Sequence, residues 1–299
     1  MPRSRVGRAA VQRLTPTRRS SDASIRPSIG GLTGSRYTER VADFDPNAPS
    51  IARVYDYFVG GRDNFAADRA LGDRLIEALP DLLPSTVENK EFLARAVTWA
   101  ANRGIRQFID VGCGMPTSPT TGEIAREVQA DARVAYIDSD PVVVSHLDAL
   151  LAHGNPGVTV VDGDVRDVPG VLARVSEGID LSQPACLIMA MLLHFFDVPD
   201  ARDLVAGYVA ALAPGSCVVL TMGLVLGEKG DAFFRTYMAD GPTKLYQHDA
   251  ADFASFFGPL ELVEPGIGDG RTVRPGWAKA PVPPERDCSI IVGIARVPA

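Results

Sequence analysis

Short apolar runs alternate with helical patterns through the middle of the chain, and this alternation constrains the fold more than any other feature. Strands separated by helices form βαβ units, which assemble into a mostly parallel sheet. Such strands are buried on both faces, so their sequences are almost continuously apolar. The expected strands are 105–111, 134–138, 158–161, 186–191 and 217–221, and the helices between them are 120–129, 141–151, 171–175 and 201–212. We therefore predict an α/β domain with helices on both faces of the sheet.

The segments on either side of this region complete the predicted organisation. Before it we expect helices at 50–58, with Ser50 as N-cap, at 64–79 and at 88–103. After it we expect helices at 231–238 and 249–257 and strands at 260–263 and 289–295. A Gly- and Pro-rich loop is expected at 266–284. The chain then divides into a disordered basic tail (1–47), an N-terminal helical cap or lid (48–104) and a core (105–299).

Charge and cysteine usage limit the possible partners and the compartment. Residues 1–47 hold nine arginines and four acids, about +5, whereas the remainder holds 21 basic and 33 acidic residues, about −12. An acidic body argues against nucleic-acid binding, since phosphate contacts supply most of that affinity. Cys113, Cys186, Cys217 and Cys288 show no CxxC spacing, which is typical of reduced thiols in a cytoplasmic protein. No apolar run is long enough to cross a membrane.

A glycine turn follows the first strand, at Asp110-Val111-Gly112-Cys113-Gly114. Glycine permits a tight strand-to-helix turn and close approach of a ligand. A dinucleotide site would prefer a third glycine where Thr117 stands, and an acid at 110 would repel a pyrophosphate. A carboxylate there suits a cationic ligand, such as the methionine part of S-adenosylmethionine. The turn therefore disfavours a nicotinamide-dependent oxidoreductase.

Two further acids follow the second and third strands. Asp138 ends the second strand, at the edge where open α/β sheets bind ligands, and its carboxylate can accept both ribose hydroxyls. Asp140 is the competing choice, but we interpret it as the N-cap of a helix that begins at Pro141. After the third strand we assign Asp164 to an adenine amine and the backbone N–H of Val165 to the adenine ring; a polar loop without a ligand is the alternative.

Several segments resemble class I methyltransferases, and more narrowly an actinobacterial S-adenosyl methyltransferase family. The resemblance covers roughly residues 48–297 and rests on the segments 49–65, 110–117, 136–141 and 193–195. It implies a Rossmann-like sheet of seven strands, with the last two closing one edge, and S-adenosyl-L-methionine as cofactor. It implies no particular acceptor. The third glycine of the general class would stand at 116, where this chain has Pro116, as does the narrower family.

The acceptor side is less constrained by the sequence. His194, just after the fourth strand, is the candidate general base, with a structural role beside Asp197 as the alternative. The segment 55–65 is expected either to cover the cofactor as a lid, with Arg62, Asp63 and Asn64 reaching the ligand, or to pack as an ordinary helix. The aromatic residues available for the acceptor pocket are Tyr237, Tyr246, Phe253, Phe257 and Trp277.

We therefore predict a methyltransferase that acts on a small-molecule acceptor, with no metal site and no nucleic-acid partner. The other histidines, His146, His153 and His248, are expected at the surface or in loops, and they lack the spacing of metal ligands. The alternative function is a non-catalytic sensor or scaffold that binds S-adenosylmethionine, because a fold does not determine its function.

Overall fold

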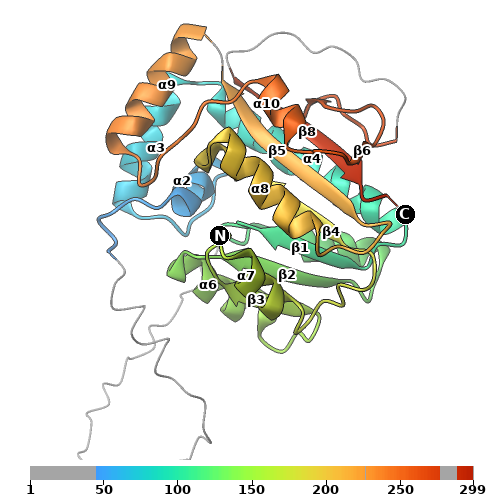
Figure 1. Ribbon diagram of the computed structural model, residues 1–299. Helices are drawn as coiled ribbons and strands as arrows, with labels where there is room; N and C mark the ends of the chain where they lie inside the picture. The colour runs from blue at the N-terminus through green and yellow to red at the C-terminus, as the bar shows by residue number, and fades with distance from the viewer. Residues whose placement is uncertain (1–44, 226, 277–287, 299) are drawn as a thin grey trace, which may run out of the picture.

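The computed structural model describes residues 45–225, 227–276 and 288–298 (Figure 1). The basic tail, apart from residues 45–47, lies outside the described residues. The helical elements are α2 (Ile51–Phe58), α3 (Ala66–Ala78), α4 (Leu82–Asn102), α5 (Thr121–Val128), α6 (Pro141–Leu147), η1 (Asp148–Ala152), α7 (Val168–Val175), η2 (Leu193–Phe195), α8 (Val198–Val209), α9 (Gly227–Asp240) and α10 (Ala250–Ser255). The strands are β1 (Gln107–Val111), β2 (Arg133–Asp138), β3 (Val158–Asp162), β4 (Cys186–Ala190), β5 (Cys217–Val225), β6 (Glu261–Leu262), β7 (Gly268–Asp269) and β8 (Cys288–Arg296).

One sheet contains all of these strands, in the order β3-β2-β1-β4-β5-β8-β6, with β7 also paired to β8. The first five strands run parallel, and β8 is antiparallel to β5, β6 and β7. This confirms the mostly parallel α/β sheet. The eighth strand is the two-residue β7, which lies inside the segment predicted to be a loop. Its short length left no apolar pattern to detect.

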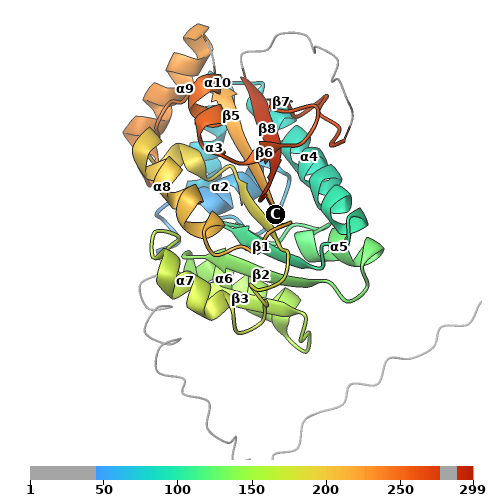
Figure 2. The same cartoon turned by 45° about the vertical axis from the view of Figure 1, so that its right-hand side comes forward.

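Alternate residues of the central strands belong to two separate apolar layers. In β1, Phe108 joins the layer formed with α4, α5 and α6, whereas Ile109 and Val111 join the layer formed with α7, α8 and α10. Figure 2 shows α4 and α5 on one side of the sheet and α7 and α8 on the other. Because side chains of a strand alternate between its faces, burial on both sides explains the continuously apolar runs.

The N-terminal helices divide between the sheet and a separate cluster. Helix α4 begins six residues before its predicted start and packs on β8 and α5. Helices α2 and α3 instead pack with α9, through a cluster of Val54, Leu71, Leu75, Tyr237 and other apolar side chains. We call α2, α3 and α9 the cap; it lies beyond one end of the sheet (Figure 1). Segments far apart in sequence therefore cover the carboxyl ends of the strands together.

No helix within the described residues is both long and apolar enough to cross a membrane.

Candidate functional site

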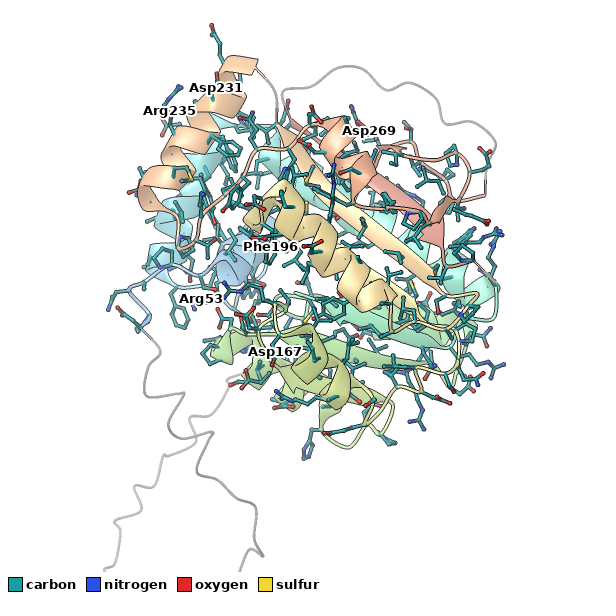
Figure 3. All side chains as sticks on the ribbon, in the orientation of Figure 1. Arg53, Asp167, Phe196, Asp231, Arg235 and Asp269 are labelled. Atoms are coloured by element: carbon teal, nitrogen blue, oxygen red, sulfur yellow. The ribbon has the colours of Figure 1, made fainter. Side chains whose placement is uncertain are left out.

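A cavity of about 880 Å³ lies between the cap and the carboxyl ends of the parallel strands. Its walls come from α2, the start of α4, the loops after β1, β2, β3 and β4, helix α9 and the segment 242–248. Figure 3 shows Arg53, from α2, and Phe196, from the segment after β4, in the region where the cap meets the sheet. His194 lines this cavity. So do all six residues predicted to bind the cofactor, namely Asp110, Gly112, Gly114, Asp138, Asp164 and Val165.

Asp110 lies near the end of β1, where the sheet buries its carboxylate. Thr121, at the start of α5, donates its hydroxyl to Oδ2 of Asp110 over 2.6 Å. The pKa of Asp110 is raised to about 6, mainly by burial; the Thr121 hydrogen bond opposes this rise, and the nearby Asp138 contributes to it. A buried carboxylate with a raised pKa is stabilised by a positively charged ligand.

The glycine turn after β1 adopts backbone angles that disfavour other residues. Gly112 and Gly114 have φ values of 66° and 65°, in the left-handed region where glycine carries no steric penalty. A Cβ at Gly112 would lie 2.8 Å from Cδ1 of Leu192, whereas a Cβ at Gly114 would meet nothing within 4 Å. The open space beside Gly114 is the cavity itself, so a ligand can approach the backbone there.

Asp138 ends β2 and joins this turn to the neighbouring loop. Its Oδ2 accepts from the backbone N–H of Gly114 over 2.9 Å, and its Oδ1 accepts from that of Asp140 over 3.0 Å. Burial raises the pKa of Asp138, while these backbone hydrogen bonds oppose the rise. Each carboxylate oxygen retains a further lone pair that can accept a hydrogen bond from a ligand.

Asp140 is the N-cap of α6, which confirms its interpretation as a capping residue. Its Oδ1 accepts from the backbone N–H groups of Val142 and Val143, over 2.8 and 3.4 Å. Ser50 is the N-cap residue of α2, as predicted, but its side chain forms no cap hydrogen bond there. The Ser50 hydroxyl instead donates to Oδ2 of Asp140, and Arg53 lies 3.7 Å from the same oxygen. A serine at a helix start has this second option when another carboxylate is within reach.

Asp164 and Val165 lie in the loop after β3, at the outer end of the cavity. Arg166 donates to both carboxylate oxygens of Asp164, with its Nε 2.9 and 3.0 Å away, and this pairing lowers the pKa of Asp164. The backbone carbonyl of Val165 accepts from the hydroxyl of Tyr208 over 3.0 Å. The backbone N–H of Val165 has no acceptor among the described residues, so it is available to a ligand.

His194 lies in η2, directly after β4, and its imidazole faces the cavity. Burial and, to a smaller extent, the neighbouring His248 together lower its pKa to about 3. The imidazole is therefore neutral near pH 7, but a conjugate acid this strong makes it a weak general base. His194 therefore lines the cavity, and its lowered pKa argues against a base of ordinary strength.

The segment predicted to be a lid contributes only its first part to the cavity. Tyr55, Asp56 and Phe58 line it, whereas Arg62, Asp63 and Asn64 do not. Asn64 donates through Nδ2 to Asp56, and Asp63 lies 3.5 Å from His146. Asn64 and the backbone of Asp63 thus stabilise the turn after α2, and the Asp63 side chain connects this turn to α6.

The aromatic residues predicted to line an acceptor pocket lie in different parts of the structure. Tyr237 and Tyr246 line the cavity, whereas Phe253 and Phe257 belong to the apolar layer beneath α8 and α10. Trp277 lies outside the described residues. His248 does lie in a loop, but its side chain is buried, and its Nε2 is 3.0 Å from the carbonyl oxygen of Phe196. The cavity is also lined by residues that no sequence pattern indicated, including Asn89, Lys90, Phe195, Phe233, Phe234 and Gln247.

These residues fit S-adenosylmethionine. The cavity has a buried acid at Asp110, a half-buried acid at Asp138, a free backbone donor at Val165, and open space beside the glycine turn. The acids match the hydroxyls and the positive charges of that molecule. No group of three or more His, Cys, Asp or Glu side chains among the described residues is arranged to hold a metal ion.

Comparisons with known proteins agree with this geometry. A candidate methyltransferase from Thermobifida fusca YX is 38% identical, with a TM-score of 0.77, over 86% of this chain and 97% of that one. A DUF574 family protein from Streptomyces avermitilis MA-4680 is 32% identical, with a TM-score of 0.78, over 85% of this chain and 99% of that one. A carboxy-S-adenosyl-L-methionine synthase from Chromohalobacter salexigens is 23% identical over 172 residues, and the match spans 56% of this chain and 57%, little more than half, of that protein.

The model of one family, described as S-adenosyl methyltransferase, matches residues 37–298. Since this match covers most of the chain, the chain belongs to the S-adenosyl methyltransferase family.

Proposed function

We propose that this S-adenosylmethionine-dependent methyltransferase acts on a small, partly apolar acceptor held in the same cavity as the cofactor. The observation that carries this proposal is the division of the cavity into two parts. Its acidic part lies at the strand ends, with Asp110 and Asp138, and its apolar part lies under the cap. The apolar part is lined by Phe58, Leu75, Phe195, Val225, Phe233 and Phe234.

The cavity volume supports an acceptor of modest size. At about 880 Å³, it falls within the range of about 300–1,000 Å³ that is usual for pockets that enclose small molecules. Aromatic and aliphatic walls favour an acceptor that buries apolar surface, and the histidine at the junction of the two parts supplies a polar contact. The acidic charge of residues 48–299, about −12, argues against nucleic acid as the acceptor.

The predicted cofactor residues take complementary roles in this proposal. Asp138 accepts hydrogen bonds from the ribose hydroxyls, and Asp164 and the N–H of Val165 contact the adenine. Asp110 stabilises the positive charge of the methionine end. Gly112 and Gly114 let the backbone approach the ligand, because a side chain at 114 would occupy the cavity.

Positioning and exclusion of water are the contributions of the protein to the transfer. When bound, S-adenosylmethionine supplies an electrophilic methyl group for in-line displacement. The cap and the apolar walls hold the acceptor in line with that group and exclude water. His194 accepts a hydrogen bond from the acceptor and orients it. Its lowered pKa keeps the imidazole neutral, so the reaction suits an acceptor that needs little help to lose a proton.

The proposal is tested in two steps on the full chain. Calorimetric titration with S-adenosylmethionine, S-adenosylhomocysteine and NAD should show binding of the two sulfur compounds alone. The protein is then incubated with methyl-labelled S-adenosylmethionine and a heat-treated cell extract, separated into low-mass and high-mass fractions. Heating inactivates the methyltransferases of the extract itself.

Label transferred to the low-mass fraction supports a small-molecule acceptor. Label in protein or nucleic acid contradicts it. Tight cofactor binding with no transfer to either fraction contradicts it as well, and favours a sensor or scaffold that binds the same cofactor.

A further inference from the structure

Three polar side chains of the cavity wall have hydrogen-bonding capacity that the described residues do not satisfy. Asn89, on α4, is only 2% exposed and donates through Nδ2 to the Tyr55 hydroxyl over 2.9 Å. Its Oδ1 is buried and has no hydrogen-bond partner among the described residues. A buried polar atom without a hydrogen-bond partner destabilises the folded state, so native structures contain few such atoms.

The Tyr55 hydroxyl is the second of these groups. It accepts the hydrogen bond from Asn89, and none of the described residues accepts its own proton. Tyr55 lies on α2 and lines the cavity, so this phenol presents a donor to the interior.

Lys90, the residue after Asn89, is the third. Its half-buried side chain lines the cavity, and within the described part of the chain its ammonium forms no ion pair or hydrogen bond. Asp56 attracts it from beyond ion-pair distance, but Oδ2 of Asp56 already accepts from the backbone of Asp63 and from Asn64. Desolvation lowers the pKa of Lys90 against that attraction. An anion in the cavity would offset this cost.

The place of Asn89 and Lys90 on α4, with Tyr55 hydrogen-bonded to Asn89, indicates which part of a ligand the three groups meet. Leu93, one helical turn after Asn89, packs against the apolar layer that contains Met115 and Ile124, whereas Val165 packs against the layer on the other face of the sheet. Met115 belongs to the loop after the glycine turn, and Ile124 lies on α5. The three polar groups therefore face the side of the cavity beside the glycine turn, away from the loop of Asp164 and Val165 after β3.

We propose that Lys90 and Tyr55 bind the carboxylate of the amino-acid end of S-adenosylmethionine, and that Asn89 Oδ1 accepts from its ammonium group. This inference rests on the proposed binding mode, in which the methionine end lies beside the glycine turn. The donors and acceptors of the protein complement those of the ligand. The Lys90 ammonium and the Tyr55 hydroxyl donate to the carboxylate, and the unpartnered Oδ1 of Asn89 accepts from the ammonium. Asp110 supplies long-range attraction to the same positive end.

The test compares two ligands that differ in this end alone. S-adenosylhomocysteine carries the amino acid, whereas 5′-methylthioadenosine keeps the nucleoside and the sulfur but lacks it. Calorimetric titration of the full chain with each ligand is repeated for Lys90→Met and Tyr55→Phe. The matched control is Arg106→Met, which also removes a positive charge, because Arg106 pairs with Asp131 at the surface and does not line the cavity.

Lys90→Met should lower the affinity for S-adenosylhomocysteine about tenfold or more, the usual effect of losing a hydrogen bond to a charged group. Affinity for 5′-methylthioadenosine should stay within about twofold, and Tyr55→Phe should show the same selectivity with a smaller loss. Arg106→Met should change neither affinity.

Two results would overturn the inference: unchanged S-adenosylhomocysteine binding in Lys90→Met, or equal losses for both ligands, which would indicate a structural role. Failure of the unmodified chain to bind either ligand would instead count against the proposed function.

Discussion

The backbone N–H of Gly114 donates to the Asp138 carboxylate over 2.9 Å, and this bond ties the loops after β1 and β2 together. The strands before them run parallel, with Val111 opposite Ile137. Both loops therefore leave the sheet at one edge, side by side. Asp138 thus holds the glycine turn while its remaining lone pairs face the cavity, so one side chain links the local backbone to ligand binding.

Replacing Asp138 tests this double role. Asp138→Ala should weaken S-adenosylhomocysteine binding by about 1–3 kcal/mol, as expected for a lost charge-assisted hydrogen bond. Calorimetric titration measures the loss. Asp131→Ala is the control, because Asp131 pairs with Arg106 at the surface, away from the cavity. Equal affinities for the two variants would remove Asp138 from the site.

A methyl group at Gly114 should block the ligand more than it disturbs the fold. Gly114→Ala adds a Cβ in open cavity space, with the strain of a left-handed alanine, about 1–2 kcal/mol. Gly60→Ala is the matched control, since Gly60 also has a positive φ and open space around it but does not line the cavity. Thermal unfolding should shift similarly in both variants, and titration should show lost binding only in Gly114→Ala. Retained binding would place the ligand elsewhere.

The affinity for the cofactor should depend on pH through Asp110. Burial raises the pKa of this carboxyl to about 6 from 3.8. Between these values the folded state holds a proton that the unfolded state releases, so the contribution of Asp110 to stability falls as pH rises through that window. A positively charged ligand favours the ionised form, so affinity should rise up to about pH 6 and level off above it.

Titrations from pH 5 to 8 measure this dependence, and buffers of different ionisation enthalpy detect the proton released near pH 6. Asp110→Asn cannot ionise at this position, so the rise should shrink to the share that Asp138, whose pKa is also raised, contributes. An unaltered pH profile in Asp110→Asn would show that Asp110 is not the titrating group.

His194 should stay neutral across the physiological range. Its pKa, lowered to about 3 by burial and by His248, predicts no titration of its imidazole between pH 5 and 8. NMR spectra of the ring, assigned by comparison with His194→Gln, measure this directly. A midpoint near 6.5 would restore a general base of ordinary strength.

The sheet could be predicted from the sequence because each buried strand consists of a continuous run of apolar residues, such as 186–191. The edge strand β7, Gly268–Asp269, could not, because two residues carry no periodicity and pair only through their backbone with β8. Helix α4 was predicted to begin at Glu88, although Leu82 is its first residue. Pro84 lies in its first turn, where proline is tolerated, so it did not mark a break.

The cofactor side was likewise predictable, because strand ends place Asp110, Asp138 and Asp164 at one edge of the sheet. The cap side was not. Asn89 and Lys90 reach the cavity because α4 runs along the sheet and α2 folds over it, and that arrangement depends on contacts between segments distant in sequence. A helical pattern shows which residues share a face, but it does not show which face meets a cavity.

The ion pair of Arg53 and Asp68 should be the main electrostatic support of the cap. Nε of Arg53 lies 2.8 Å from Oδ2 of Asp68, and the side chains are 3% and 0% exposed. Asp68 also accepts from the backbone N–H groups of Ser50 and Phe65, each over 2.8 Å. Arg53→Met would leave the Asp68 carboxylate buried without its cation, and should lower the free energy of unfolding by about 3–5 kcal/mol.

Urea unfolding measures this loss, with Arg74→Met as the control. Arg74 pairs with Asp240 at the surface, where the side chains are 49% and 45% exposed, so its removal should cost less than about 1 kcal/mol. Adding Asp68→Asn to Arg53→Met should recover part of the stability, because the amide keeps an acceptor for the backbone while removing the uncompensated charge. If the two arginine variants lose the same stability, the buried pair is no stronger than a surface pair, and packing of Leu71, Leu75 and Tyr237 must hold the cap instead.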